Sequence, residues 1–294
     1  MKTAIVTGAT GFIGYHLTKK LSALDIFVYA IIRPNSKNKQ RLQNLANIKI
    51  IELDMVDIKK LSTIITGKFD CFFHIAWDGE RNDFIKQYQN VDYTIQALES
   101  AKKLGCKRFI CTGSQAEYGL SENLVTEETI PKPNTAYGAA KVAACYLSKY
   151  RAEQIAIEWT WTRIFSVYGK YDNPKALIPY VVDSFKDNKG VNLTACQQKW
   201  NYLYIEDAVN ALVLLMEQGK SGEIYNIASN ETKVLKEFVE EIKNIIKSNS
   251  TINYSTDNRM VVSLNPCIKK IMTDTSWKIK FKFSEGINEI IRDK

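Results

Sequence analysis

Short apolar runs and longer amphipathic segments alternate along the first half of the chain. The runs are almost continuously hydrophobic, as expected of parallel strands that helices cover on both faces. They lie at residues 2–7, 26–32, 48–54, 69–77 and 108–112. Apolar residues at helical spacing begin at Tyr15, and a second such segment runs from residue 88 to Leu104, where Gly105 ends it. The alternation predicts an α/β fold with a doubly wound parallel sheet and a ligand site at the carboxyl ends of its strands.

The first predicted strand leads into a turn with three glycines at three-residue spacing, Gly8, Gly11 and Gly14. Gly8 permits a bend that other residues avoid, Gly11 lets a pyrophosphate approach the main chain, and Gly14 lets the next helix lie close to the strand. The first amides of that helix, and the positive end of its dipole, would face the phosphates. A turn that merely needs positive φ is the alternative, but the flanking strand and helix favour a dinucleotide-binding turn.

The end of the second predicted strand bears on the choice of cofactor. NAD-specific sites usually place an acidic residue about 20 residues after the glycines to hold the ribose hydroxyls. Arg33 occupies this place, and Ser36 and Lys37 follow it. An arginine with a hydroxyl and a lysine nearby suits a ribose 2′-phosphate, so the sequence favours NADP over NAD. The alternative is an ordinary solvated basic loop.

The third and fourth predicted strands carry further candidates. Asp54 ends the third and could accept a bond from an adenine amino group, or cap a helix that starts near Asp57. Ala76 is small enough to leave room for a cofactor. His74 is interpreted as a core or hydrogen-bonded histidine rather than a catalyst.

Composition narrows the classes of function. The chain has 294 residues, 45% of them hydrophobic, and a net charge of +8. Because the Lys and Arg residues are scattered among Asp and Glu, with no basic stripe, an anionic small ligand is a better interpretation than nucleic acid. The six cysteines lack metal-site spacing and there are only two histidines, so neither a metal site nor a disulfide framework is expected. With no leader and no membrane-spanning run, we expect a cytoplasmic protein.

Three residues could carry chemistry at the carboxyl end of the sheet. Ser114 follows the fifth predicted strand, and Tyr137 and Lys141 lie four apart, hence on one face of an alanine-rich helix. A lysine cation near a phenol favours the phenolate, which would lower the tyrosine pKa from its usual value of about 10. Tyr137 could then exchange a proton with a substrate hydroxyl or carbonyl, while Ser114 hydrogen-bonds the same oxygen.

In the combination of these motifs the sequence resembles the extended short-chain dehydrogenase/reductase family, in particular its nucleotide-sugar epimerases, dehydratases and ketoreductases. The resemblance covers nearly the whole chain. It implies a Rossmann-type fold, NADP or NAD as cofactor, a nucleotide diphosphate sugar as substrate, and Ser114, Tyr137 and Lys141 as catalytic triad. It also implies that Asn90 supports the lysine through water. The implied cofactor-binding residues are Gly8, Thr10, Gly11, Phe12, Ile13, Gly14, Arg33, Asp54, Met55, Ile75, Ala76, Trp77, Asn90, Thr112, Tyr137, Lys141, Phe165 and Val167.

The resemblance further implies two domains. Residues 1–170 would form the dinucleotide-binding domain, to which residues 193–228 return. Residues 171–192 and 229–294 would form a smaller α/β domain that binds the nucleotide diphosphate sugar. Relatives often dimerise through two helices, here near 84–104 and 136–153, so a homodimer is expected. The alternative is that the apolar faces of these helices pack inward.

Departures from the family pattern bear on the reaction. Dehydratases of the family carry an Asp-Glu pair directly after the catalytic hydroxyl residue, whereas this chain has Gln115 and Ala116, which argues against dehydration. Trp200 replaces the usual diphosphate-binding arginine, and Lys199 or Arg259 would supply the charge unless both are merely solvated. The expected substrate-binding residues are thus Gln115, Ala116, Trp200 and Arg259.

Our leading hypothesis is a reductase that acts on a keto group, most plausibly at carbon 4, of a nucleotide-activated deoxysugar, as in cell-surface polysaccharide biosynthesis. Arg33 favours it, because a net reduction commonly draws on NADPH. The runner-up is a nucleotide-sugar 4-epimerase that keeps NAD bound. A non-catalytic NADP-binding redox sensor ranks well below both, because the chain retains Ser114, Tyr137 and Lys141.

Overall fold

Seven parallel strands form the central sheet of the computed structural model, which describes residues 1–121, 123–256 and 264–292. Their order is β3-β2-β1-β4-β5-β6-β10. The strands are β1 Thr3–Thr7, β2 Phe27–Ile32, β3 Ile48–Glu52, β4 Cys71–His74, β5 Arg108–Ser114, β6 Glu158–Ile164 and β10 Glu223–Ile227. This order confirms the doubly wound α/β fold, and the direction of winding reverses between β1 and β4.

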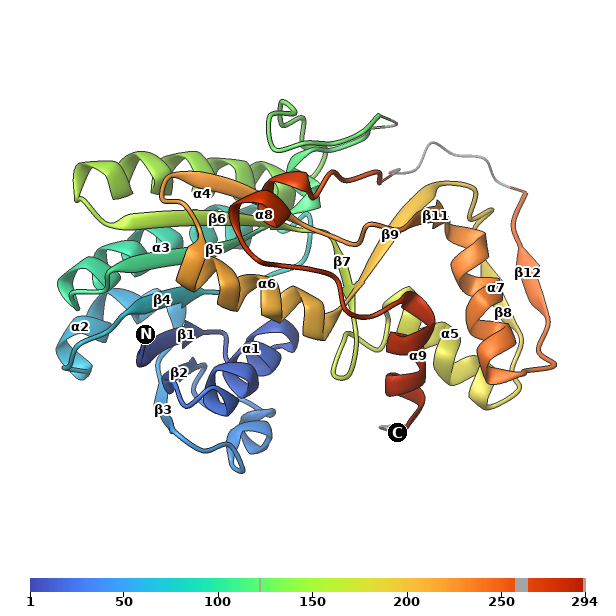
Figure 1. Ribbon diagram of the computed structural model, residues 1–294, viewed down its shortest axis with the longest axis horizontal. Helices are drawn as coiled ribbons and strands as arrows, with labels where there is room; N and C mark the ends of the chain where they lie inside the picture. The colour runs from blue at the N-terminus through green and yellow to red at the C-terminus, as the bar shows by residue number, and fades with distance from the viewer. Residues whose placement is uncertain (122, 257–263, 293–294) are drawn as a thin grey trace.

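Helices cover both faces of the sheet (Figure 1). Helices α1 (Phe12–Ala23) and α6 (Ile205–Gln218) pack together on one face, and α3 (Phe84–Lys103) and α4 (Ala136–Gln154) pack together on the other. Each layer has its own hydrophobic core, so the strands are buried on both sides. Short elements connect the layers: η1 Lys39–Leu42, η2 Met55–Lys60, α2 Leu61–Ile64 and η3 Gln115–Glu117.

The ends of these elements follow from local hydrogen bonds. The side chain of Thr135 accepts the amide of Gly138 and so caps α4, and Gly105, at φ +69°, follows the end of α3. Strand β4 is shorter than the strand predicted from the apolar run at residues 69–77. The reason is that the amides of Ile75 and Ala76 donate to the Thr7 hydroxyl, at 3.1 and 3.2 Å, instead of continuing a ladder.

A smaller lobe lies at the right of Figure 1. It contains a three-stranded sheet, β11-β9-β7, and a two-stranded sheet, β12-β8, with helices packed around them. Its elements are β7 Ser166–Tyr168, α5 Leu177–Lys186, β8 Val191–Leu193, β9 Lys199–Tyr204, β11 Thr232–Val234, α7 Leu235–Ile246, β12 Ile252–Tyr254 and α9 Phe283–Arg292.

The chain crosses between the two lobes more often than the expected division implies. Strand β9 belongs to the small sheet, while α6 and β10, which follow it, belong to the main domain. Helix α8 (Lys269–Asp274) contacts β10, and Trp277 donates a hydrogen bond to the carbonyl of Asp207 at 3.0 Å. Residues 269–277 therefore pack on the larger lobe, although the expected division placed them in the smaller domain.

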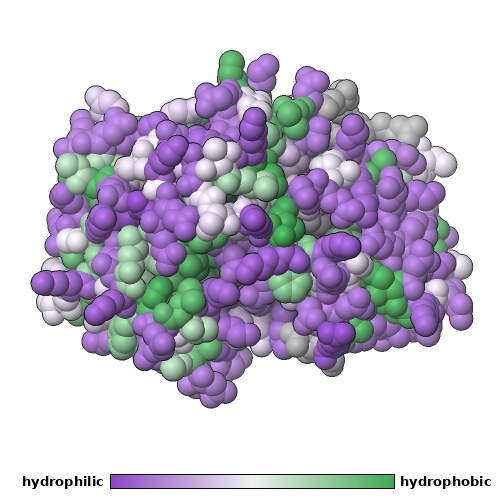
Figure 2. Space-filling model, viewed as in Figure 1, coloured by the Kyte–Doolittle hydropathy of each residue, from purple (hydrophilic) through white to green (hydrophobic). Residues whose placement is uncertain are grey.

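The face of the molecule seen in Figure 2 is largely hydrophilic, with small scattered hydrophobic areas. No helix in the described ranges has both the length and the apolar character needed to cross a membrane. All six cysteines are free, and only Cys267 is not fully buried.

Candidate active site

A cavity of about 700 Å³ lies over the carboxyl ends of β1 to β4, where the winding of the sheet reverses. Its volume lies in the range typical of small-molecule sites. The lining includes most of the residues predicted to bind the cofactor: Gly8, Thr10, Gly11, Phe12, Ile13, Gly14, Arg33, Asp54, Met55, Ile75, Ala76 and Trp77. Further lining residues are Ile31, Pro34, Asn35, Ser36, Lys37, Asn38 and Asp78.

The glycine turn at one end of this cavity fits a diphosphate. Gly8 has φ +68°, and its carbonyl accepts the amide of Gly11 at 2.9 Å. A Cβ on Gly14 would overlap that same carbonyl, so the helix can lie this close to the turn only with glycine there. Gly11 caps α1 without a side-chain hydrogen bond, which leaves the first amides of the helix to a ligand.

The opposite rim of the cavity is basic. The exposed Arg33 lies 3.4 Å from Asp78, which also pairs with Lys86 at the same distance. Because exposed ion pairs contribute little free energy, a phosphate dianion could displace Asp78 from Arg33. The Ser36 hydroxyl lies 3.0 Å from that of Thr10, which ties the basic loop to the glycine turn.

Asp54 lines the cavity and also caps a helix. Its carboxylate accepts the amide of Val56 at 3.2 Å, at the start of η2. The two roles considered for Asp54 are therefore compatible, since one oxygen caps the helix and the residue still borders the cavity.

Ser114, Tyr137 and Lys141 come together beside this cavity. Ser114 ends β5, and Tyr137, in the first turn of α4, lies close enough to it for the Ser114 hydroxyl to lower the pKa of the phenol. Lys141 is buried one turn further along α4, and its Nζ donates a 2.6 Å hydrogen bond to the carbonyl of Thr112. The same Nζ lies 5.9 Å from the ring centroid of Tyr137.

The pKa of Tyr137 is raised above its usual value, so the predicted lowering by Lys141 is wrong for this structure. Burial of the phenol is the largest cause, and it outweighs the lowering by the Ser114 hydrogen bond and by the charge of Arg81. Burial also lowers the pKa of Lys141, to about 8. At neutral pH both groups therefore retain their protons.

A buried ion pair, which the sequence analysis missed, fixes the backbone of Ser114. Glu117 has no exposed surface, and its carboxylate accepts the Ser114 amide at 2.8 Å and Nε of Arg163 at 2.7 Å. It also accepts Nε1 of Trp161 at 2.9 Å. The pattern Ser114-x-x-Glu117 is a capping box and is formed here, so this signal was present in the sequence.

The loop after β4 is held by two buried side chains of α3. Asn90 accepts the amide of Asp78 at 3.1 Å and donates to its carbonyl at 2.8 Å. Gln87 donates to the carbonyl of Glu80 at 2.8 Å. Asn90 thus has a direct role in holding this loop.

Two other predicted residues lie away from the cavity lining. Phe165 is buried, with its amide donating to the carbonyl of Ile227, and Val167 lies in β7 paired with Leu203. His74 is buried and hydrogen-bonded to Thr7, and burial lowers its pKa to about 3. The interpretation of His74 as a core histidine is confirmed.

The predicted substrate residues are spread between the lobes. Gln115 lies beside Ser114, with its amide 3.4 Å from the Ser166 hydroxyl, and Ala116 is buried. Trp200 lies in β9 near Tyr202, and its Nε1 is buried without an acceptor among the described residues. Arg259 lies outside the described residues.

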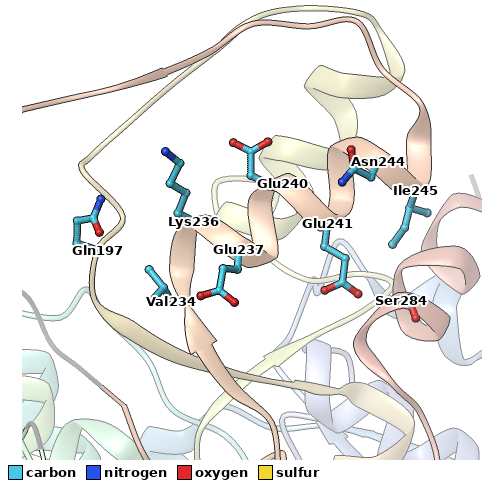
Figure 3. A pocket seen from close by; sticks show the side chains of 9 residues that line it. All are labelled: Gln197, Val234, Lys236, Glu237, Glu240, Glu241, Asn244, Ile245 and Ser284. Atoms are coloured by element: carbon cyan, nitrogen blue, oxygen red, sulfur yellow. The ribbon is translucent and has the colours of Figure 1, made fainter.

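A second groove, of about 800 Å³, lies in the smaller lobe along α7 (Figure 3). Glu237, Glu240 and Glu241 line it, with Gln197 on one side and Ser284 of α9 on the other. None of the predicted site residues lines it. Because its carboxylates would repel a diphosphate, we place the candidate active site at the first cavity.

The chain resembles known proteins over most of its length. The model of the NAD dependent epimerase/dehydratase family matches residues 4–228. The dTDP-D-glucose 4,6-dehydratase of Bos taurus is 27% identical, over 99% of this chain and 88% of that protein. The CDP-abequose synthase of Salmonella muenchen is 28% identical, over 100% of this chain and 98% of that protein.

Solved structures share the fold. The UDP-N-acetylglucosamine 4-epimerase from Methanobrevibacter ruminantium M1, in complex with UDP-N-acetylmuramic acid, superposes with a TM-score of 0.90 at 23% identity. The match covers 99% of this chain and 97% of that one. Since the family model spans most of the sequence, and the predicted resemblance to extended short-chain dehydrogenase/reductases is thereby confirmed, the chain belongs to the NAD dependent epimerase/dehydratase family of enzymes.

Proposed function

We propose that this enzyme reduces a keto group, at carbon 4, of a nucleotide-activated deoxysugar, with NADPH as reductant. One observation carries the choice of reduction over dehydration: no acid-base carboxylate follows Ser114 where a dehydratase needs one. Gln115 is an amide, Ala116 is apolar, and the next carboxylate, Glu117, is buried and paired with Arg163. Proton transfer then rests on Tyr137.

The relatives support the class of substrate. The dTDP-D-glucose 4,6-dehydratase and the CDP-abequose synthase are named for a dTDP-linked and a CDP-linked sugar. The CDP-abequose synthase matches this chain end to end and carries the name of a CDP-linked sugar product. We infer a nucleoside diphosphate sugar, with its diphosphate and base toward the smaller lobe.

The residues present fit the proposed reduction. A nicotinamide dinucleotide in the cavity would supply hydride to the carbonyl carbon. Tyr137 would donate its proton to the carbonyl oxygen, while the Ser114 hydroxyl hydrogen-bonds that oxygen, so the ketone becomes an alcohol. The charged Lys141 would stabilise the resulting phenolate until water returns the proton. The raised phenol pKa keeps the proton on Tyr137 before turnover, as the reductive direction requires.

The function is tested by mixing the purified enzyme with NADPH and CDP- or dTDP-linked 4-keto-6-deoxysugars. We expect loss of NADPH absorbance in step with formation of the 4-hydroxy sugar. Interconversion of 4-hydroxy sugars with no NADPH consumed would indicate the epimerase instead. Failure to act on any sugar nucleotide would remove the proposal.

Arg33 is the residue on which the preference for NADP rests. Replacing Arg33 by Asp removes the cation that would pair with a 2′-phosphate and places an acid where ribose hydroxyls bind. We expect the ratio of kcat/KM for NADPH over NADH to fall by about 100-fold, given charge-assisted hydrogen bonds of about 1.5–3 kcal/mol. Lys39→Ala is the matched control, since this exposed cation pairs with Glu52 and does not line the cavity. An unchanged ratio in Arg33→Asp would show that another group selects the cofactor.

We further infer that a second copy of the chain covers the outer face of α3 and α4. Large apolar side chains are exposed on both helices, and α3 and α4 lie against each other. They are Phe84, Ile85 and Tyr88 near the start of α3, and Tyr146, Leu147 and Tyr150 in the second half of α4. Exposed apolar groups of this size are typical of an interface between protein chains.

The dimer is tested by sedimentation of the wild type and of a variant with Leu147→Asp and Tyr150→Asp. We expect a dimer for the wild type and a folded monomer for the variant, because two buried carboxylates would be costly. Met272→Asp, at an exposed apolar residue on α8, should leave the dimer intact. A monomeric wild type at micromolar concentration would refute the inference.

A further inference from the structure

Trp77 contacts both members of the Tyr137–Lys141 pair. The Nζ atom of Lys141 lies 3.5 Å from the centroid of the Trp77 ring, over its face. The ring of Tyr137 meets the indole edge-on, at 6.0 Å between centroids and an interplanar angle of 90°. We propose that Trp77 is a positioning residue, whose indole face holds the Lys141 ammonium beside the phenol of Tyr137.

Two successive hydrogen bonds fix the orientation of the Trp77 indole. Its Nε1 donates a 2.7 Å hydrogen bond to the side-chain oxygen of Gln87. Gln87 is buried, and its amide nitrogen is anchored in turn on the carbonyl of Glu80 at 2.8 Å. The ring therefore cannot rotate away from Lys141 without breaking a hydrogen bond of a buried amide, which costs free energy.

The Lys141 ammonium has few other favourable contacts, which makes the Trp77 indole face important to it. Lys141 is 2% exposed, and the one hydrogen bond it donates among the described residues goes to the carbonyl of Thr112. No described carboxylate forms an ion pair with it. A buried charge without a counter-ion is unfavourable, and the negative face of an indole attracts a cation most strongly where water is excluded.

The other titratable groups around Lys141 come from four elements. The Glu117 carboxylate of η3 favours the charged lysine, Cys111 of β5 and His74 of β4 are neutral near pH 7, and Tyr137 lies on α4 itself. Burial dominates and lowers the pKa of Lys141 to about 8. A weaker attraction from the indole face should lower the pKa of Lys141 further.

Ordinary core packing is the competing explanation for Trp77, and fluorinated indoles separate the two. Fluorine withdraws electrons from the ring face but changes its size little. We would place mono-, di- and tetrafluorotryptophan at position 77 by nonsense suppression. The readout is the pH titration of Lys141 by its ¹³Cε NMR signal, assigned with Lys141→Met.

We expect the Lys141 midpoint to fall stepwise with each fluorine substitution, by about one pKa unit in all. The same series at position 161 is the matched control. The Trp161 ring lies farther from Nζ, at 5.9 Å, so its fluorination should move the midpoint much less than fluorination at position 77. Equal midpoints across the position 77 series would overturn the proposal and leave Trp77 as packing.

The catalytic meaning of this contact rests on the proposed function, and a second measurement keeps the two apart. The alkaline limb of kcat should move to lower pH in the order of the NMR midpoints, because turnover needs the charged lysine. Shifted midpoints with an unmoved limb would uphold the contact and refute the role of Lys141 in turnover. Unshifted midpoints would refute the contact, whatever the activity.

Discussion

Replacing Tyr137 by Phe is expected to lower kcat by about 100-fold or more, with little change in the Kd for the dinucleotide. The phenol is the proton donor in the proposed reaction, and a positioned general acid typically contributes a factor of about 100 to 10,000. The dinucleotide cavity is formed by other residues, among them the glycine turn, and these stay in place. Steady-state kinetics and fluorescence titration with NADPH measure the two effects separately.

The matched control for Tyr137→Phe is Tyr118→Phe. Tyr118 is another tyrosine close to Ser114 in the sequence, but it is buried and its hydroxyl donates to the side chain of Asn226 at 2.7 Å. Its loss should reduce stability more than turnover. If Tyr137→Phe turned over at the wild-type rate, another group would have to supply the proton and the mechanism would be wrong.

The largest loss of stability is expected for Glu117→Ala. This change leaves Arg163, which is fully buried, without its counter-ion, and deprives the Ser114 amide of its acceptor. Removing one partner of a buried pair typically costs about 3–5 kcal/mol. Burial would otherwise disfavour the charged guanidinium, and the Glu117 carboxylate is the main reason why the pKa of Arg163 is raised instead.

Urea denaturation measures this loss, with Glu52→Ala as the matched control. Glu52 pairs with Lys39 at 2.6 Å on the surface, and such a pair contributes at most about 1 kcal/mol. Replacing both partners, with Glu117→Leu and Arg163→Met, should restore much of the stability, because no unpaired buried charge remains. Equal losses for Glu117→Ala and Glu52→Ala would mean that the buried pair is not what holds the Ser114 turn.

The sequence predicted well those features that depend on residues close together in the chain. The glycine turn needs only the strand before Gly8 and the helix after Gly14, and the lining of the cavity follows from the order of the strands. The capping box of Ser114 and Glu117 was equally local, yet it went unused because its partner, Arg163, is 46 residues further along the chain. No periodic pattern of residues in the sequence indicates a contact such as Glu117–Arg163.

The features that the sequence did not predict depend on burial and on contacts between distant parts of the chain. The expected pKa of Tyr137 counted the charge of Lys141 but not the loss of water around the phenol, and the second effect is larger. The contact of Trp77 with Lys141 likewise joins a strand end to a helix 64 positions later. The return of residues 269–277 to the larger lobe depends on single anchors such as Trp277, which carry no periodic signal.

One dinucleotide is expected to span the cavity, from the basic rim at Arg33 to the phenol of Tyr137. A crystal structure of the enzyme with NADPH tests it most directly. We expect the diphosphate at the start of α1, the 2′-phosphate beside Arg33, and carbon 4 of the nicotinamide facing the space next to the Tyr137 hydroxyl. A diphosphate bound elsewhere, or a nicotinamide ring out of reach of Tyr137, would contradict it.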